Sequence, residues 1–141
     1  MIAGSKAFIE KGRVYRKMFG GGMRQAGVIA AAGLIALEKS PARLHVDHEN
    51  AKRLAEGIAE TPGLKIDPKK VRSNIVIFDC SKTGKTAVEL CDALYPQGVW
   101  AQDTAVHLVR MVTHCDVDRA GIERALVVLA EVVSKTRKVS A

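Results

Sequence analysis

The sequence predicts an α+β fold in which helices pack on a small, mainly antiparallel sheet. Segments with apolar residues at helical spacing fill most of the chain, and three short runs rich in β-branched residues lie in its second half. The expected order is three helices, a strand, a helix, two strands and a last helix. The chain has 141 residues, 48% of them hydrophobic, which is enough for one core of ordinary size.

The first two expected helices lie on either side of a run of three glycines. Residues 5–19 form the first helix, with Ser5 as its N-cap, and the glycines end it. The second helix spans 23–38 and is apolar on nearly all sides, which is the pattern of a buried helix. A three-stranded sheet with few aromatic residues offers little to cover it. We therefore expect part of its surface to pack against something outside this chain.

The remaining elements are bounded by helix-start and turn signals. A third helix begins at Ser40-Pro41 and continues to about Glu60, where the sequence Thr-Pro-Gly stops it. The later elements are, in order, a strand at 73–80, a helix at 85–94, strands at 99–104 and 106–114, and a helix that Asp116 caps and that ends near Lys135.

Charge and cysteine content restrict the class of protein. The formal net charge is +7, which favours an anionic partner, but the basic residues are scattered and there is no aromatic stacking platform. Nucleic-acid binding is therefore only a remote alternative. Three cysteines without CxxC spacing predict reduced structural thiols and a cytoplasmic location. Neither a secretory signal pattern nor an apolar run of membrane-spanning length is present.

Several short motifs do not meet the requirements of the site that they suggest. The stretch 79–86 ("DCSKTGKT") has Asp79 where a phosphate-binding loop needs its first glycine. His45 and His48 share one helix face, but no third metal ligand accompanies them. His114 and Cys115 are adjacent in an expected strand and should therefore point to opposite faces. No metal site and no catalytic residue is predicted from these motifs.

Arg110 is the first candidate for a binding residue. It lies within an otherwise apolar strand, "HLVRMVTH", where a charged guanidinium needs a partner because burying it alone is costly. One interpretation is an ion pair with a local carboxylate. The other is a planar fork for an anionic ligand, since arginine binds a carboxylate with two parallel hydrogen bonds.

The segment "RKMFGGGMRQ" is the second candidate. Its plain structural interpretation is a glycine-rich helix stop with ordinary flanking charges. Its functional interpretation is that glycines allow the backbone to approach a ligand or another subunit closely, with Lys17 and Arg24 adding positive charge for an anion. The loop residues concerned are Gly20, Gly21 and Gly22.

Four separated segments together resemble one known family. The stretches "GSKAFIEKGRVYRKMFGGGMRQAGVIAAAGLIALE", "LHVDHENAKRLAEGI", "SNIVIFD" and "VRMVTHCDVD" look like the later part of the threonine aldolases. These are pyridoxal-phosphate-dependent lyases of the aspartate-aminotransferase fold type. The resemblance covers nearly the whole chain, to about residue 135, and implies that residues 41–141 form the small C-terminal α+β domain. Residues 1–40 would normally pack on a cofactor-binding domain that is absent here.

The resemblance also implies an activity and roles for the candidate residues. Such enzymes cleave β-hydroxy-α-amino acids, threonine or allo-threonine, to glycine and an aldehyde, as part of threonine catabolism. The arginine matching Arg110 holds the substrate α-carboxylate. The residues matching Lys17 and Arg24 lie near the cofactor phosphate in the active site of the neighbouring subunit, so a homo-oligomer is expected.

One departure from the family pattern limits these expectations. The family's Schiff-base lysine lies in a loop that would precede Met1, and Lys6 belongs instead to the start of the first helix. We therefore expect a C-terminal portion of a lyase that is inactive alone. A non-catalytic dimerisation or interaction module remains the alternative.

Overall fold

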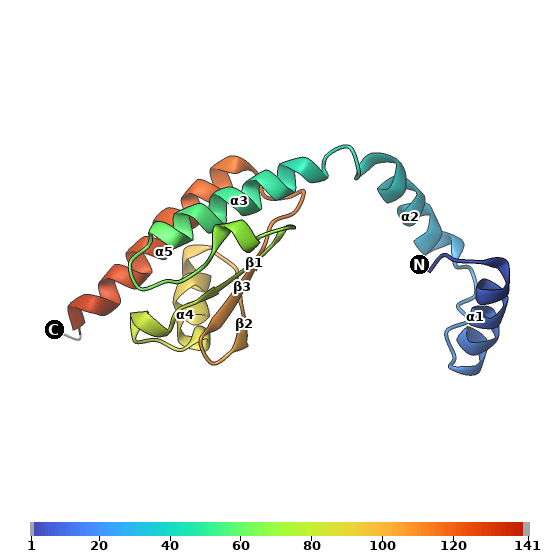
Figure 1. The fold of residues 1–141 in the computed structure, drawn as a ribbon, viewed down its shortest axis with the longest axis horizontal. Helices are drawn as coiled ribbons and strands as arrows, with labels where there is room; N and C mark the ends of the chain where they lie inside the picture. Colours follow the sequence, from blue (N-terminus) through green and yellow to red (C-terminus); the bar gives the residue numbers. More distant parts are fainter. Residues whose placement is uncertain (1, 140–141) are drawn as a thin grey trace. The chain divides into compact units, whose positions relative to one another are not determined.

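The computed structural model describes residues 2–139, with side chains to residue 135, and contains five α-helices and three strands within that range. The order predicted from the sequence is confirmed (Figure 1). The elements are α1 (Lys6–Met18), α2 (Gly27–Lys39), α3 (Leu44–Glu60), β1 (Ile75–Asp79), α4 (Ala87–Leu94), β2 (Gln102–Ala105), β3 (Leu108–Val112) and α5 (Arg119–Val139). The chain divides into two compact units after Pro41, and each is described by itself.

The first unit consists of α1, the glycine segment and α2. The Ser5 hydroxyl accepts a hydrogen bond from the Phe8 N–H at 3.3 Å, so the predicted N-cap of α1 is confirmed. At the other end, the Gly20 N–H donates to the Lys17 carbonyl and the Gly21 N–H to the Arg16 carbonyl. This pair of bonds is a Schellman motif, which satisfies carbonyl groups that the end of the helix would otherwise leave without partners.

Helix α2 differs from its expectation in start and in burial. It begins at Gly27 rather than at residue 23, since residues 24–26 form a turn in which Gln25 has a positive φ of 47°. The expectation of a buried helix is wrong for this chain. Val28 is 75% exposed and Ile29 63%, and none of the helix's residues is buried. The apolar sequence of α2 indicates that the helix needs a covering surface, which the other described residues of the first unit do not provide.

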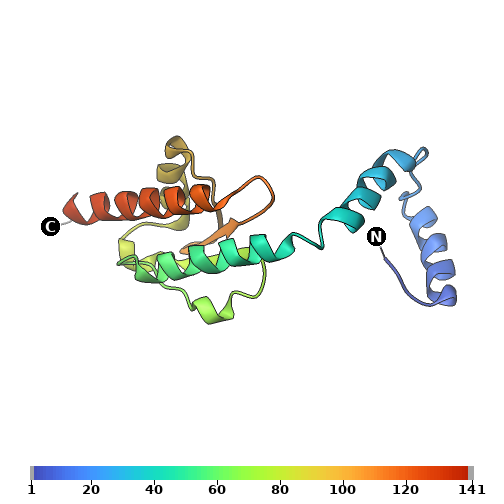
Figure 2. The same ribbon diagram turned by 90° about the horizontal axis from the view of Figure 1, so that it is seen from above.

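The second unit is a two-layer structure with all three helices on one face of the sheet. The strand order is β1-β3-β2 and both pairs are antiparallel, which confirms the predicted small antiparallel sheet. Figures 1 and 2 show α3 and α5 lying side by side. Alternation along the strands sends Val76 and Phe78 of β1 and Val109 of β3 toward the helices.

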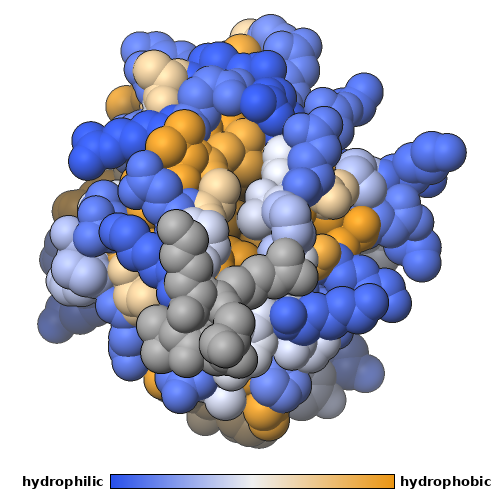
Figure 3. Space-filling view, turned by 90° about the vertical axis from the view of Figure 1, so that its left-hand side faces the viewer, coloured by the Kyte–Doolittle hydropathy of each residue, from blue (hydrophilic) through white to orange (hydrophobic). Residues whose placement is uncertain are grey.

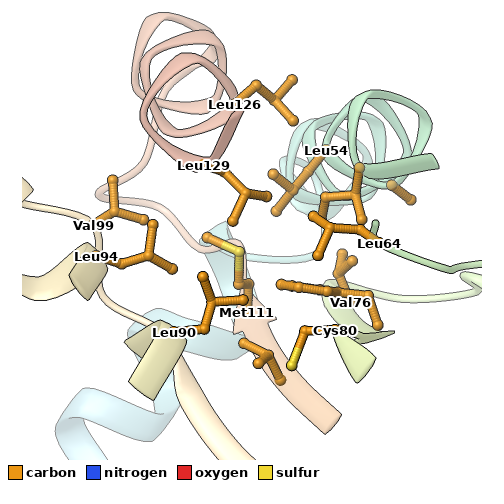
Figure 4. Close-up of a cluster of buried hydrophobic side chains, with 14 of the residues drawn as sticks. Leu54, Leu64, Val76, Cys80, Leu90, Leu94, Val99, Met111, Leu126 and Leu129 are labelled. Atoms are coloured by element: carbon orange, nitrogen blue, oxygen red, sulfur yellow. The ribbon is translucent and has the colours of Figure 1, made fainter. Parts of the chain in front are cut away.

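The core lies between this sheet face and the helices (Figure 4). Its fully buried members include leucines of α3, α4 and α5: Leu54, Leu90, Leu94 and Leu129. On the side of the molecule that Figure 3 shows, hydrophilic side chains cover most of the surface, with hydrophobic areas between them. The scarcity of aromatic residues thus gives an aliphatic core, as the composition predicts, with Phe78 as its one fully buried aromatic side chain among the described residues.

Helices α3 and α5 approach each other closely at Gly57. A Cβ atom at this position would lie 2.5 Å from a methyl group of Leu126, a distance that real Cβ contacts essentially never reach. One turn earlier, the Arg53 guanidinium donates to both carboxylate oxygens of Glu123, at 2.8 and 2.6 Å. The glycine sets the spacing of the two helices and the ion pair fixes their register.

Several predicted boundaries are wrong by a few residues. Helix α3 begins at Leu44, three residues after Pro41, and β2 begins at Gln102 rather than at residue 99. The N-cap role assigned to Asp116 belongs to Asp118, whose carboxylate accepts from the Gly121 N–H at 2.8 Å. Strand β3 ends at Val112, so His114 lies in the following loop and not in a strand.

Candidate functional site

The candidate site is the face of the sheet that carries no helix. The residues of β1 and β3 that alternate with the core positions point to this face, and four of them are large hydrophobic residues between 39% and 47% exposed: Ile75, Ile77, Leu108 and Val112. Arg110 lies among them, because it pairs with Ile77 of β1 on one side and with Gln102 of β2 on the other. The face is therefore apolar with a single guanidinium at its middle strand.

Within the described part of the chain, the guanidinium of Arg110 makes one side-chain hydrogen bond and leaves one buried donor unused. Its Nη2 donates to the Oε1 of Gln102, the cross-strand neighbour on β2. Its Nε is buried and has no hydrogen-bond partner among the described residues. A buried donor without a partner costs about 1–3 kcal/mol, so we expect this N–H to be paired by water or by a bound ligand. The ion pair with a local carboxylate, one of the two interpretations from sequence, is not formed within the part of the chain that the structure describes.

This geometry suits a carboxylate. The Nε and Nη2 atoms of an arginine lie on one edge of its plane and bind both oxygens of a carboxylate in parallel. Nη2 of Arg110 already donates to Gln102, but it carries two N–H groups, so it has a second hydrogen for a carboxylate oxygen beside the one from Nε. Charge-assisted hydrogen bonds are stronger beside apolar side chains than in open solvent.

The glycine segment has a structural role that accounts for part of its sequence. Gly20 has a φ of +75°, which the Schellman motif requires and which a side chain disfavours. At Gly21 a Cβ atom would lie 3.1 Å from the Arg16 Cγ. Arg16 and Lys17 lie in the last turn of α1, where a positive charge interacts favourably with the helix dipole. The helix-stop interpretation is therefore confirmed for the first two glycines.

Gly22 remains without such an explanation. It has no positive φ, and a Cβ there would make only ordinary contact, 3.6 Å from the Lys17 Cδ. Lys17 thus lies beside the loop, as the functional interpretation requires, and both Lys17 and Arg24 are exposed. These two cations belong to the first unit and Arg110 to the second.

In the stretch 79–86, which partly resembles a phosphate-binding loop, side chains of the same segment accept hydrogen bonds from backbone N–H groups. The Asp79 carboxylate accepts a hydrogen bond from the Ser81 N–H at 2.6 Å, and bonds from Ser81 lower the pKa of Asp79. At the start of α4, Thr86 and Glu89 form a capping box, so the Thr86 hydroxyl and the Glu89 carboxylate satisfy each other's backbone N–H groups. The N–H groups of Ser81, Thr83, Lys85 and Thr86 therefore already have partners within the chain.

The loop after β3 contains a cluster that the sequence reasoning dismissed. His114, Cys115 and Asp116 are exposed, and their ligand-type atoms all lie within 4.8 Å of one another. The prediction that His114 and Cys115 point to opposite faces is wrong, because that argument applies to a strand and these residues lie in a loop with a turn at 115–116. His114 and Asp116 also line a pocket of about 390 Å³, together with Trp100 and Arg124. His45 and His48 are exposed on α3.

Comparison with known proteins identifies the family. The model of the family described as beta-eliminating lyase matches residues 1–81. The chain belongs to this family. A probable low-specificity L-threonine aldolase 2 from Arabidopsis thaliana is 39% identical over 127 residues, which are 89% of this chain and 36% of that relative. A low-specificity L-threonine aldolase from Escherichia coli O157:H7 is 35% identical over 119 residues, or 84% of this chain and 34% of the relative.

The family member described here spans about a third of the length of these curated relatives. Among solved structures, MppP soaked with the product 2-ketoarginine aligns with a TM-score of 0.55 at 20% identity, covering 70% of this chain and 30% of that one. This similarity concerns the fold, and it agrees with the mixed helix-and-sheet architecture. No helix within residues 2–139 is both long and apolar enough to cross a membrane.

Proposed function

We propose that this chain forms the substrate-anchoring part of a threonine-aldolase-like lyase. The reaction is the cleavage of a β-hydroxy-α-amino acid, threonine or allo-threonine, to glycine and an aldehyde. The observation that carries the proposal is the Arg110 Nε, a buried donor at the centre of an apolar sheet face that has no partner among the residues the structure describes. The similarity to threonine aldolases over most of the chain supports it.

Arg110 binds the α-carboxylate of the substrate in this proposal. Its Nε and Nη2 donate to the two carboxylate oxygens, while the hydrogen bond to Gln102 holds Nη2 in place. Ile77, its cross-strand neighbour, is the apolar side chain beside the ion pair. The two hydrogen bonds fix the Cα of the amino acid relative to the sheet, which orients the Cα–Cβ bond that breaks.

The cofactor implied by the family is pyridoxal phosphate, which when bound supplies the electron sink for the carbanion. The residues present fit one part of it. Lys17 and Arg24 are exposed cations beside a loop whose third glycine leaves room for close approach, as a phosphate group needs. The lysine loop of the family has no counterpart in this sequence. We therefore propose a phosphate contact through Lys17 and Arg24, in a homo-oligomer, and no turnover by the 141-residue chain alone.

Two measurements test this proposal. The purified chain is mixed with pyridoxal phosphate and threonine, and glycine release is recorded; we expect none. In a chimera, the chain then replaces the matching third of the Escherichia coli aldolase, and we expect threonine cleavage to return. Turnover by the chain alone would refute the inactivity. A folded, cofactor-loaded chimera without any cleavage would refute the proposed function.

A second candidate is a non-catalytic interaction module in the cytoplasm. The observation that favours it is α2, whose apolar side chains are exposed although the helix is apolar on nearly all sides. Such a surface on a soluble chain needs a partner. Size-exclusion chromatography of the chain with and without the Escherichia coli aldolase tests this candidate. Co-elution supports it, and separate elution of a monomeric chain contradicts it.

A further inference from the structure

The loop between β3 and α5 brings together three side chains of different chemistry. His114, Cys115 and Asp116 are consecutive, and a turn at the last two folds their side chains toward one another. The His114 Nδ1 lies 3.4 Å from the Asp116 Oδ2, and the Cys115 Sγ lies 3.6 Å from the Asp116 Oδ1. Nitrogen, sulfur and oxygen atoms that bind metals thus converge on one side of an exposed loop.

These separations match the edges of a tetrahedral zinc site. With Zn–N and Zn–O bonds of about 2.05 Å and a Zn–S bond of about 2.3 Å, the tetrahedron has N–O edges of about 3.35 Å and S–O edges of about 3.55 Å. The N–O and S–O separations of 3.4 and 3.6 Å are close to these values but use different oxygens of the one carboxylate, and the N–S separation is within 4.8 Å. Rotation of that carboxylate brings one oxygen toward both partners.

The contacts within the loop are short and local. The Asp116 N–H donates to the His114 Nδ1 at 3.3 Å. The same nitrogen is 3.4 Å from a carboxylate oxygen of Asp116. A metal ion bound by both side chains would replace these contacts with coordinate bonds.

The surroundings allow a fourth ligand. His114 and Asp116 line the pocket of about 390 Å³, and its other walls include Trp100 and Arg124. A site with three protein ligands keeps one position for water or for a small molecule in such a pocket. The other two thiols are not competitors, because burial raises the pKa of Cys80 and raises that of Cys91 to about 11. Thiolates are the form that binds metal.

We propose that His114, Cys115 and Asp116 form a binding site for a borderline-soft divalent metal ion such as Zn²⁺. Imidazole and thiolate together favour this class over Mg²⁺ or Ca²⁺, which prefer oxygen ligands. Binding converts the Cys115 thiol to a thiolate and releases one proton to solvent, while the imidazole gives up its hydrogen bond from the Asp116 N–H. The proposal is independent of the lyase function, since none of its residues contacts Arg110 in the described hydrogen bonds.

The test titrates the full-length chain with Co²⁺, whose bond to a thiolate gives a near-ultraviolet charge-transfer band. We expect a one-to-one complex with this band, displaced by Zn²⁺. Cys115→Ser should abolish the band, and Asp116→Asn should weaken binding at least tenfold. The matched controls are Cys91→Ser and the double variant His45→Gln with His48→Gln, which should bind as the parent does.

Alkylation gives a second readout that does not depend on the spectrum. Zn²⁺ should slow iodoacetamide modification of Cys115 at least tenfold, as read by peptide mass spectrometry. The proposal is overturned by an absent charge-transfer band, by a band that survives Cys115→Ser, or by loss of binding in the His45/His48 double variant. Equal alkylation of Cys115 with and without Zn²⁺ would overturn it as well.

Discussion

Arg110 and Gln102 face each other across the β2–β3 pair, and the terminal nitrogen of the arginine donates to the glutamine amide oxygen while its Nε stays buried without a partner among the described residues. The glutamine therefore holds Nη2, and the Nε on the same edge of the guanidinium keeps an unused donor. An arginine that was present only for structure would be expected to use its buried donor. This relationship makes Arg110 the strongest candidate for a ligand-binding residue in the chain.

The first prediction concerns the end of α1. Gly20→Ala should destabilise the Schellman turn by about 1–2 kcal/mol, because alanine disfavours a φ of +75°. Circular dichroism should show a loss of helix, and amide exchange at residues 19–21 should become faster. Gly22→Ala is the matched control and should leave both signals unchanged, since its Cβ has ordinary space. An equal effect of the two substitutions would contradict the Schellman assignment.

The second prediction concerns the core of the second unit. Leu129→Ala should lower the free energy of unfolding by about 2–5 kcal/mol, because the side chain is fully buried between α5 and the sheet and its removal leaves a cavity. Urea unfolding followed by circular dichroism measures the loss. Val127→Ala, at a position that is 58% exposed on the same helix, should change the value by no more than about 0.5 kcal/mol. A small effect at Leu129 would show that the described core is not the stabilising one.

The third prediction is a pH dependence of α4. Hydrogen bonds from Thr86 lower the pKa of Glu89 below its ordinary value of 4.5, so the charged capping box stabilises the folded state. The contribution is complete above pH 4.5 and is lost as the pH falls through the lowered pKa of the folded state. Glu89→Ala should therefore destabilise the chain at pH 7, and the difference from the parent should shrink in acid. A difference that stays constant down to pH 2 would rule out a role for the charge.

Sequence reasoning succeeded where local chemistry decides the structure. Helical and strand periodicities gave the correct order of elements, and Ser5 was correctly expected as an N-cap because its hydroxyl acts over three residues. Where two equivalent residues compete, the sequence did not discriminate: Asp116 and Asp118 are both able to cap a helix, and α5 uses the second. The dismissal of His114 and Cys115 failed for a related reason, since the point at which β3 ends was placed two residues too late.

Nonlocal relationships could be anticipated only in part. The apolar run of α2 indicates a need for burial, but no pattern says which surface covers it, and the other described residues of the first unit do not. The charge of Arg110 within an apolar strand correctly marked it as exceptional. Its pairing with Gln102 depends on the register of two strands joined by a short turn, which includes a bulge between Asp103 and Ala105. That register was not readable from the sequence.

The measurement that tests the central claim most directly is the effect of Arg110→Lys on threonine cleavage by the chimera with the Escherichia coli aldolase. Lysine keeps the charge but loses the two parallel hydrogen bonds, which is a loss of about 1.5–3 kcal/mol for bonds to a charged group. We predict a KM for threonine raised about 10- to 100-fold, with cofactor loading unchanged. Arg72→Lys, an exposed arginine outside the sheet, is the control and should leave KM unaltered. An unchanged KM in the folded Arg110→Lys chimera would contradict the assignment of Arg110 as the carboxylate-binding residue.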